Sequence, residues 1–543
     1  MNRIVELPPL KIFILAIALA TFSWLFRPTW AYATDIQPKS LLVDYSWPSS
    51  INGTYTVDGA AADLGQYNYV VLGDGLEETT HGDHANTVAI LAHADMANTS
   101  VFGYIDLGVS TQNLSMADIE THIDEWQTTG AVGIFLDDFG YDFQTSRSRQ
   151  NEAVEYAHSK GLSVVANGWE PADVFGSDVD ATYNPDGFSP SLNSDDYYLY
   201  ESYQVNTGAY ESETNWRTKA DQLASYQSSI AFKVLAVTTN DATDTYDENK
   251  FFYAWYSGLL SGYEAVGWGD TIFGADDAIL PFHTPPTVDV GTSFVGDIIE
   301  TSPVYSRMTD TGKIAVDASS NSYSFTNLPD LSVTSVTSDV TTATAGGNAT
   351  ITVAIQNNGS ADSGDLDATV SIDGTTVSTV SIASIAAGAA SSFTYTYSGV
   401  SISPNPHVLM ATLDPSNAIE EISETNNTGS LSLAVQLSAP TLVFPVNLAR
   451  IRTTTPILRW QAVSGAQRYQ VTVTTSTGTV VARGILLGNG KISYTYGNAF
   501  DISVGSITAL TDGTSYRWSV RASANGSYGP ASSFWHFTVA LPH

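Results

Sequence analysis

Two acids at the ends of apolar segments are the residues of this sequence best placed for chemistry. The segment Gly133–Gly140, GIFLDDFG, is an apolar run that ends in Asp137 and Asp138. A further acid, Glu201, lies near the end of the segment YYLYESY at residues 197–203. Two carboxylates can hydrolyse a glycosidic bond, one as nucleophile or base and the other as general acid. We therefore take Asp137 and Glu201 as the candidate catalytic pair, and we expect no cofactor and no metal.

Strand alternation separates Asp137 from its neighbour Asp138. Successive side chains of a strand point to opposite faces. If Ile134 and Leu136 pack outward against helices, Asp137 faces inward and Asp138 points toward the helices or into the next loop. An Asp that follows a strand can instead cap the next helix, and this alternative is open for both acids.

Eight short apolar segments, separated by amphipathic helical stretches, are predicted strands. They span residues 41–47, 67–74, 101–108, 132–138, 162–169, 197–203, 232–239 and 263–270. Parallel strands need helical crossovers, so this alternation predicts a (β/α)₈ barrel. A doubly wound open sheet is the alternative, but no G-x-G-x-x-G follows the first predicted strand. In the sixth predicted strand, alternation places Leu199, Glu201 and Tyr203 on one face.

Aromatic and polar residues at the ends of these strands predict a carbohydrate cleft. The active site of such a barrel lies at the C-terminal ends of its strands. The candidate substrate-binding residues there are Asp44, Tyr45, Tyr104, Asp106, Tyr141, Asn167, Trp169, Tyr203 and Trp268. Aromatic faces stack on sugar rings, and carboxylates hydrogen-bond hydroxyl groups. Few basic residues fall there, which argues against a phosphate-bearing substrate.

The charge of the chain is distributed unevenly. The net charge is −35; residues 34–328 carry 43 acids against 10 basic residues, and residues 329–437 carry 10 against none. Residues 438–543 reverse this, with 2 acids against 8 basic residues. Such an acidic body repels nucleic acid and anionic membranes, and it suits a cationic or neutral ligand.

The chain divides into a signal segment and three predicted domains. Residues 1–33 combine flanking basic residues, an apolar run and the small-residue sequence AYA, which predicts an export signal and a secreted or cell-surface protein with no later membrane span. The barrel with a C-terminal hairpin, turning at Thr311-Gly312, is expected over 34–328. Two β-sandwiches are expected over 329–437 and 438–543, because their sequences alternate with period two between glycine turns.

The barrel segment resembles a known enzyme family. The stretches FGYIDLG, GIFLDDFGYDF, VVANG and YLYESY, within residues 41–270, are similar to the endo-α-1,4-polygalactosaminidase barrels and their spherulin-4-like relatives. In that family a G-(V/I)-F-L-D strand end and a later strand-end Glu carry the proposed catalytic carboxylates. The resemblance implies those roles for Asp137 and Glu201, and a galactosamine-containing polymer as substrate.

Both C-terminal modules also resemble known families. PDLSV, ATITVAIQNNGSADSG and LDPSNAIEEISETNNTGS, within residues 329–430, are similar to CARDB, the cell-adhesion-related domain of bacteria. Residues 440–539 resemble a fibronectin type III module, with Tyr516 in the place of its tyrosine corner. These modules imply spacing or adhesion outside the cell.

Two functions follow from the sequence. The first is an exported, endo-acting glycoside hydrolase that cleaves an extracellular or envelope polysaccharide with two carboxylates. The alternative is a non-catalytic adhesion or glycan-binding protein whose barrel is silent, with surface or matrix contacts made by the β-sandwiches.

Overall fold

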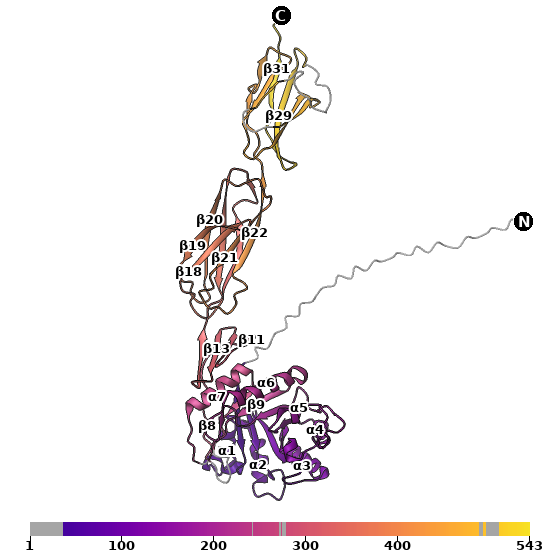
Figure 1. Ribbon diagram of the computed structural model, residues 1–543, viewed down its shortest axis with the longest axis vertical. Helices are drawn as coiled ribbons and strands as arrows, with labels where there is room; N and C mark the ends of the chain where they lie inside the picture. The colour runs from indigo at the N-terminus through magenta and orange to yellow at the C-terminus, as the bar shows by residue number, and fades with distance from the viewer. Residues whose placement is uncertain are drawn as a thin grey trace, which may run out of the picture.

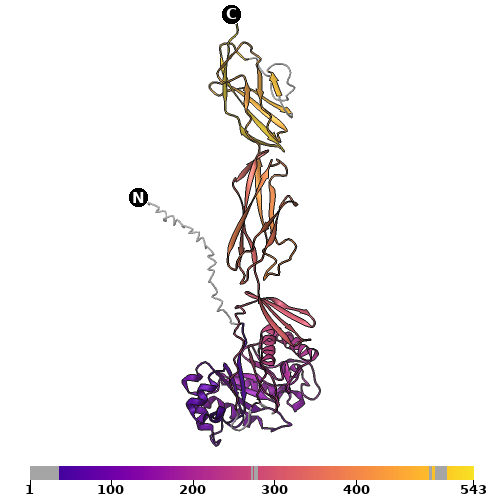
Figure 2. The same cartoon turned by 90° about the vertical axis from the view of Figure 1, so that its left-hand side faces the viewer.

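The protein is elongated, with a barrel at one end and two β-sandwiches in line beyond it (Figures 1 and 2). The computed structural model describes residues 36–241, 243–270, 273, 279–487, 492–495 and 510–542. The predicted signal, residues 1–33, lies outside the described residues. A small four-stranded sheet lies between the barrel and the first sandwich (Figure 1).

The N-terminal part forms a closed barrel of eight parallel strands in the order β1-β10-β9-β6-β5-β4-β3-β2. The strands are β1 (Lys39–Asp44), β2 (Tyr69–Leu72), β3 (Ser100–Asp106), β4 (Gly133–Asp137), β5 (Ser163–Ala166), β6 (Tyr197–Tyr200), β9 (Lys233–Val237) and β10 (Ala265–Gly267). The predictions of a closed parallel barrel and of several β-sandwich sheets after it are confirmed, and the alternative of an open sheet is excluded.

Helices connect successive barrel strands. They are α1 (Val57–Leu64), α2 (His84–Leu91), α3 (Met116–Thr129), α4 (Arg147–Ser159), α5 (Pro171–Phe175), α6 (Glu213–Ile230) and α7 (Glu248–Ser261). Short 3₁₀ turns are η1 (Pro48–Gly53), η2 (Ala94–Met96) and η3 (Tyr141–Phe143), and β7 (Val205–Asn206) pairs with β8 (Ala209–Tyr210) in the loop after β6. Local sequence sets the helix ends: α3 begins at a capping box formed by Ser115 and Asp118, and it stops at Gly130, where φ is +107°.

Alternating side chains of the strands fill two cores. One set fills the barrel interior; it consists of Leu41, Val43, Tyr69, Val71, Phe102, Phe135, Val165, Leu199, Leu235, Val237 and Ala265. The other set, which includes Ile134 and Leu136 of β4, packs against the helices. Gly103 of β3 makes room for the Trp126 ring of α3, since a Cβ at this position would lie 2.0 Å from the indole. This alternation fixes Asp137 on the inner side.

The four-stranded sheet extends the barrel core. It consists of β11 (Phe294–Thr301), β12 (Val304–Thr309), β13 (Gly312–Asp317) and β14 (Ser322–Asn327), in that order. β12 and β13 form the expected hairpin with its turn at Thr311-Gly312, and two further strands flank it. Tyr305 packs edge-on against Trp216 of α6, with 5.3 Å between ring centroids. The sheet is therefore anchored to the helical layer.

The first sandwich pairs a three-stranded sheet, β15-β17-β20, with a five-stranded sheet, β16-β22-β21-β18-β19. Its strands are β15 (Leu331–Ser338), β16 (Thr342–Thr344), β17 (Asn348–Asn357), β18 (Leu366–Ile372), β19 (Thr375–Ile382), β20 (Ala390–Ser398), β21 (His407–Leu413) and β22 (Thr428–Gln436). The DPSNAIEEISETNN segment connects β21 to β22. Its Glu421 is buried and accepts hydrogen bonds from Leu331 N (2.6 Å) and Asn427 Nδ2 (3.0 Å).

Glu421 predicts a pH-dependent stability of this sandwich. Burial raises the pKa of Glu421 to about 7, although the hydrogen bonds from Leu331 and Asn427 act to lower it. Because the folded state holds this proton more tightly than the unfolded state, the stabilisation is complete below the unfolded pKa of 4.5 and is lost as pH rises through 7. We expect the free energy of unfolding to fall by at most about 3 kcal/mol over this range. Chemical denaturation at pH 4.5 and 8 measures the fall; Glu421→Gln, which keeps an acceptor for Leu331 N, should reduce it, and an unchanged fall would contradict this assignment.

The second sandwich carries the sheets β23-β25-β28 and β24-β31-β29-β26-β27, with β30 paired to β29. Its strands are β23 (Leu442–Phe444), β24 (Ala449–Ile451), β25 (Ile457–Trp460), β26 (Arg468–Thr475), β27 (Val480–Leu487), β28 (Ile492–Thr495), β29 (Ser515–Ala524), β30 (Ser527–Ala531) and β31 (Trp535–Val539). Its core holds four buried aromatic residues, Trp460, Tyr469, Tyr516 and Trp518. Thr511 N donates to the Tyr516 hydroxyl (2.9 Å), as in a tyrosine corner.

The two sandwiches share one hydrophobic core. Leu409 and Leu433 of the first belong to the same buried cluster as Trp460 and Val471 of the second. At the junction, Ile402 packs on Gly465, where an added Cβ would lie 3.0 Å from the Ile402 side chain. The junction is therefore packed like the interior of a domain.

Candidate active site

One amide joins the two candidate carboxylates. Asn167 follows β5, and its Nδ2 donates to Asp137 Oδ1 (2.8 Å) and to Glu201 Oε2 (3.3 Å). The two carboxylate oxygens are therefore separated by at most the sum of these distances, about 6 Å. Asp137 is the last residue of β4, and Glu201 directly follows β6. The structure thus brings Asp137, Asn167 and Glu201 together at the C-terminal end of the barrel.

The two acids differ in their hydrogen-bond donors. Burial raises the pKa of both. For Asp137, the Tyr104 hydroxyl, the Asp138 N–H (2.9 Å) and Asn167 oppose that rise. For Glu201, Asn167 and the Lys219 ammonium oppose it, whereas the charge of Asp137 adds to it. Three donors favour the carboxylate form at Asp137, while Glu201 with fewer donors is better suited to hold a proton.

Two tyrosines close the inner side of the carboxylate pair. Tyr45 and Tyr104 meet edge to face with 5.5 Å between ring centroids, and Tyr45 also meets Phe273 at 5.8 Å. The pKa of Tyr45 is raised well above its usual value by burial and then by the charges of Asp137 and Glu201. The Tyr104 hydroxyl is hydrogen-bonded to Asp137, and the Tyr45 hydroxyl stays protonated near both acids.

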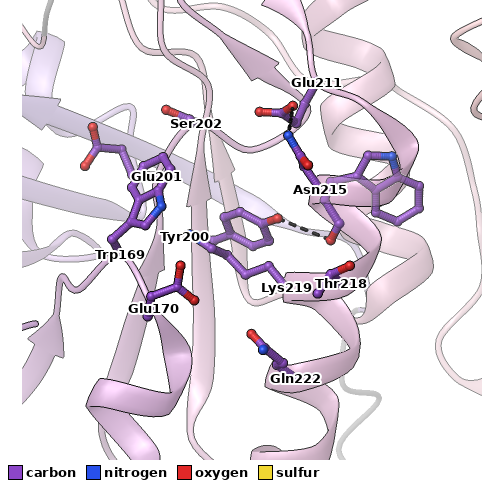
Figure 3. Close-up of a pocket in the computed structure, with 11 residues that line it drawn as sticks. Trp169, Glu170, Tyr200, Glu201, Ser202, Glu211, Asn215, Thr218, Lys219 and Gln222 are labelled. Atoms are coloured by element: carbon purple, nitrogen blue, oxygen red, sulfur yellow. Dashed lines mark hydrogen bonds between the residues drawn. The ribbon is translucent and has the colours of Figure 1, made fainter.

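A cavity of about 340 Å³ opens on one side of Glu201 (Figure 3). Figure 3 shows Trp169, Glu170 and Glu201 on one side of this cavity and Asn215, Thr218 and Lys219 of α6 on the other. The Lys219 ammonium lies 4.3 Å from the Trp169 ring centroid and 4.9 Å from that of Tyr200. Burial lowers the pKa of Lys219 to about 8, although the nearby acids Glu170, Glu201 and Glu211 oppose this.

A second cavity of about 390 Å³ opens on the other side of Glu201. It is lined by the loops after β6, β9 and β10; the lining includes Asn206, Thr239, Asn240, Asp241 and Phe273. Trp169, Glu201 and Ser202 line both cavities, and the Trp169 side chain is 48% exposed between them. Glu201 therefore borders both cavities, whereas Asp137 is in the lining of neither.

Asp44 and Asp106 do not reach the cleft, in contrast to the expectation from the sequence. Asp44 is fully buried, and its side chain points outward from the barrel on the same side of β1 as Leu42. Its Oδ1 accepts a hydrogen bond from Ser46 N (2.9 Å). Asp106 faces inward, but its oxygens accept from Gly108 N (2.7 Å), Thr111 Oγ1 (2.7 Å) and Gln112 N (3.2 Å). These hydrogen bonds fix the conformation of the loop after β3, so the Asp106 carboxylate is already occupied.

Tyr203 and Trp268 also lie away from the cleft. Ser202 has φ of +57°, which ends the strand alternation after Glu201, so Tyr203 turns outward and packs 4.8 Å from Tyr200 between ring centroids. Trp268 is buried in the outer core, and its Nε1 donates to Asp270 Oδ1 (2.8 Å). Face assignment by alternation fails for Tyr203 because it extends the strand beyond its last paired residue, whereas Trp268 keeps the outward phase of Val266.

Tyr141 and Asp138 lie in the loops next to the pair. Tyr141 stacks on Tyr183, with 5.2 Å between centroids, at the rim of the barrel. Asp138 has φ of +53° and faces the loop after β3, where an added Cβ at Gly108 would lie 2.9 Å from the Asp138 Cβ. Burial and the charge of Asp137 raise the pKa of Asp138 to about 6.

Lys219 is the neighbour of the pair that the sequence did not indicate. It lies on α6, in the segment TNWRTKADQ, with no local signal that separates it from a solvent-exposed lysine. In the described part of the chain, no group of three or more His, Cys, Asp and Glu side chains could hold a metal ion. None of the described helices is long and apolar enough to cross a membrane.

Comparison with known proteins identifies the middle of the chain. The CARDB family model matches residues 328–430, as the sequence predicts, which indicates a cell-surface or extracellular protein. A comparison with curated proteins found no match.

Several solved structures are similar to parts of the chain. A CARDB domain from Pyrococcus furiosus in complex with di-metal ions is 21% identical and covers 20% of this chain and 89% of its own, with a TM-score of 0.19. A domain of a putative cell surface protein from Methanosarcina acetivorans is 26% identical and covers 20% and 92%, with a TM-score of 0.18. The FN1–FN3 domains of chicken CNTN1 are 12% identical and cover 44% and 77%, with a TM-score of 0.16.

Proposed function

We propose that this protein is an exported glycoside hydrolase that cleaves an extracellular or envelope polysaccharide, with galactosamine-containing polymers as the first candidates. The observation that carries the proposal is the Asn167 amide, which bridges Asp137 Oδ1 and Glu201 Oε2 and so keeps these two oxygens within about 6 Å, with Glu201 lining two cavities. Paired carboxylates at this separation, one richer in donors than the other, are what glycosidic cleavage requires. We assign the barrel to the (β/α)₈ class and keep the domain limits 34–328, 329–437 and 438–543.

The short separation supports a double displacement. Retaining enzymes hold their carboxyl groups about 5–5.5 Å apart, whereas inverting enzymes need roughly 6.5–9.5 Å for an intervening water. In the first step the Asp137 carboxylate attacks the anomeric carbon, while Glu201 gives its proton to the departing glycosidic oxygen. In the second step Glu201 takes a proton from water, whose oxygen displaces Asp137 from the anomeric carbon. The product would keep the configuration of the substrate.

The two cavities support cleavage within a chain. Sugars on both sides of the scissile bond need a site on both sides of Glu201, and the cleft offers two. Trp169 stands between them as a stacking surface, and Tyr45, Tyr104 and Asn167 would contact the sugar at the cleavage point. The acids Glu170 and Glu211 in the first cavity suit an amino sugar.

A glycan panel tests the proposal. The mature chain is incubated with polymers that differ in sugar and charge, including a galactosamine-rich exopolysaccharide, and new reducing ends are measured. The double variant Asp137→Asn/Glu201→Gln should release none, whereas the control Asp186→Asn/Glu248→Gln, with two exposed barrel acids changed, should match the wild type. Binding without hydrolysis by the wild type across the panel would instead support the adhesion or glycan-binding alternative, to which the CARDB match adds weight.

A further inference from the structure

Five arginines of the second sandwich share one face of a sheet. They are Arg450 of β24, Arg468 of β26, Arg483 of β27, and Arg517 and Arg521 of β29. These strands belong to the sheet β24-β31-β29-β26-β27, at the end of the molecule far from the barrel (Figure 1). We call this set the arginine face.

Strand alternation and register place all five side chains outward. In β29, Tyr516, Trp518, Val520 and Ala522 are buried, so Arg517 and Arg521 point away from the core. Arg521 pairs with Gln470 and Arg468 with Ser523, both on the face opposite to the buried Tyr469 and Val471.

The edge strands continue the same face. Arg483 pairs with Thr472, which lies between the buried Val471 and Val473. Arg450 pairs with Thr538, which in turn pairs with Ser515 of β29. Between the arginines, the outward positions of β26, β29 and β31 carry Ser, Thr, Gln and His, so the centre of this face is polar and basic. The register places Ile485 and Leu487 of β27 and Tyr528 of β30 at its edges.

Within the described part of the second sandwich, no ion pair neutralises the arginine face. The second sandwich holds two acids in its sequence; Asp512 lies in the loop before β29, and Asp501 lies outside the described residues. Among the described residues, no ion pair joins any of the five arginines to an acid. Arg517 is held by Thr474 Oγ1, which accepts from its Nε (3.1 Å), and by the ring of Phe534, 4.6 Å away. Four of the five are exposed.

The spacing of the arginines suits a long anionic chain. Neighbouring strands lie about 4.8 Å apart, so Arg450 and Arg517 are separated by about 10 Å across the sheet, and so are Arg521 and Arg483. Arg517 and Arg521 are about 13 Å apart along β29. A polymer with anionic groups at intervals can meet several of these guanidinium groups at once, and each can bind a carboxylate or phosphate in bidentate fashion.

The composition of the face distinguishes among anionic partners. Protein interfaces bury an apolar or aromatic centre, and the centre of this face is Ser, Thr and Gln. Single-stranded nucleic acids stack on several aromatic side chains in succession; here Phe534 at the margin is covered by Arg517, and the exposed Tyr528 lies at the edge, on β30. Duplex nucleic acid is read by an α-helix or a two-stranded β-ribbon that enters its major groove, and a broad sheet face does not enter that groove. A hydrated polysaccharide with more widely spaced charges fits the hydroxyl-rich face.

We propose that the arginine face of the second sandwich binds an acidic polysaccharide, through carboxylate or phosphate groups spaced along the glycan. The basic end then attaches the protein to an anionic glycan, while the acidic barrel at the other end is kept free of it. This proposal does not depend on hydrolysis by the barrel.

Binding of the mature chain to immobilised polymers tests the proposal. The probes are polygalacturonate, a poly(glycerol phosphate) glycopolymer, neutral dextran and double-stranded DNA, each at several salt concentrations. The variant Arg483→Gln/Arg521→Gln removes two charges from the arginine face. The control Arg459→Gln removes an exposed arginine of β25, which belongs to the other sheet of the same domain.

We expect the arginine-face variant to bind at least one of the two acidic polymers about tenfold more weakly, with a smaller salt dependence, and the control to stay within about twofold of the wild type. Which polymer binds tells whether carboxylate or phosphate is preferred. Equal loss in both variants, equal binding to dextran, or tighter binding to DNA would overturn the proposal. So would an absence of binding to both acidic polymers, or a variant that only abolishes self-association in sedimentation.

Discussion

Glu201→Gln should slow the cleavage of a polysaccharide by about 10³-fold, yet it should leave the first step on an activated aryl glycoside nearly unchanged. A poor leaving group needs the proton that Glu201 supplies, and general acid catalysis contributes about 10²–10⁴-fold. A nitrophenolate departs without that proton. Pre-steady-state release of nitrophenol, compared with reducing-end release from the polymer, measures the difference.

The companion substitution should behave differently. Asp137→Asn removes the attacking oxygen, so cleavage of both substrates should fall by about 10⁴-fold or more. Because burial raises the pKa of Glu201, it stays protonated to a higher pH than an exposed glutamate, and the wild-type rate should decline on the basic side as Glu201 ionises. That basic decline should disappear in Glu201→Gln. If the aryl glycoside slows equally in both variants, the two roles are assigned wrongly.

Arg147→Met should be the most destabilising single substitution in the barrel, by about 3–5 kcal/mol. Arg147 is the first residue of α4 and is fully buried. Its Nη1 donates to Val174 O (2.7 Å), and its Nη2 donates to Asp173 O (3.0 Å) and Gly176 O (2.8 Å). Methionine fills part of the volume but removes the donor of Val174 O and Gly176 O, while Asp173 O keeps Gln150 Nε2 (3.2 Å). Unpaired buried polar groups are costly.

Calorimetry of the full chain can separate this effect from a general one. The transition of the barrel should move to lower temperature, whereas unfolding of the sandwiches should be unchanged, because Arg147 contacts neither. Arg468→Met, an exposed arginine of the second sandwich, should leave the barrel transition in place. A barrel transition that moves equally little in both variants would show that water replaces the guanidinium at small cost.

The inner face of β4 could be predicted from sequence because its alternation is uninterrupted. Once the strand belongs to a parallel barrel, Ile134 and Leu136 must pack against the helices, which leaves Asp137 on the inner face. The structure has this arrangement. The CARDB segment was also recognisable, because the spacing of its acidic and Asn residues is specific.

The residues that the sequence analysis placed differently, or did not indicate, depend on loop conformation and tertiary packing, which a residue pattern does not encode. The expected alignment of Tyr203 with Glu201 required alternation to continue past Tyr200, but a positive φ at Ser202 rotates the chain by one face. Asp106 has the expected orientation, yet the loop after β3 uses its oxygens, and no sequence pattern distinguishes an acid that binds a loop from one that binds a ligand. Lys219 approaches the pair only through the packing of α6 against β6.

The common core of the two sandwiches has a mechanical consequence. Ile402 and Leu437 pack on Gly465 at the joint, within a hydrophobic cluster that both sandwiches share, so we expect the joint to resist bending and the sandwiches to act as a stiff arm. Under the proposed activity and the proposed anchoring, a barrel carried by this arm would move over a shell around the point of attachment and would rarely touch the surface beneath it. Material next to the anchor would therefore be spared, and cleavage would be concentrated at a set height above it.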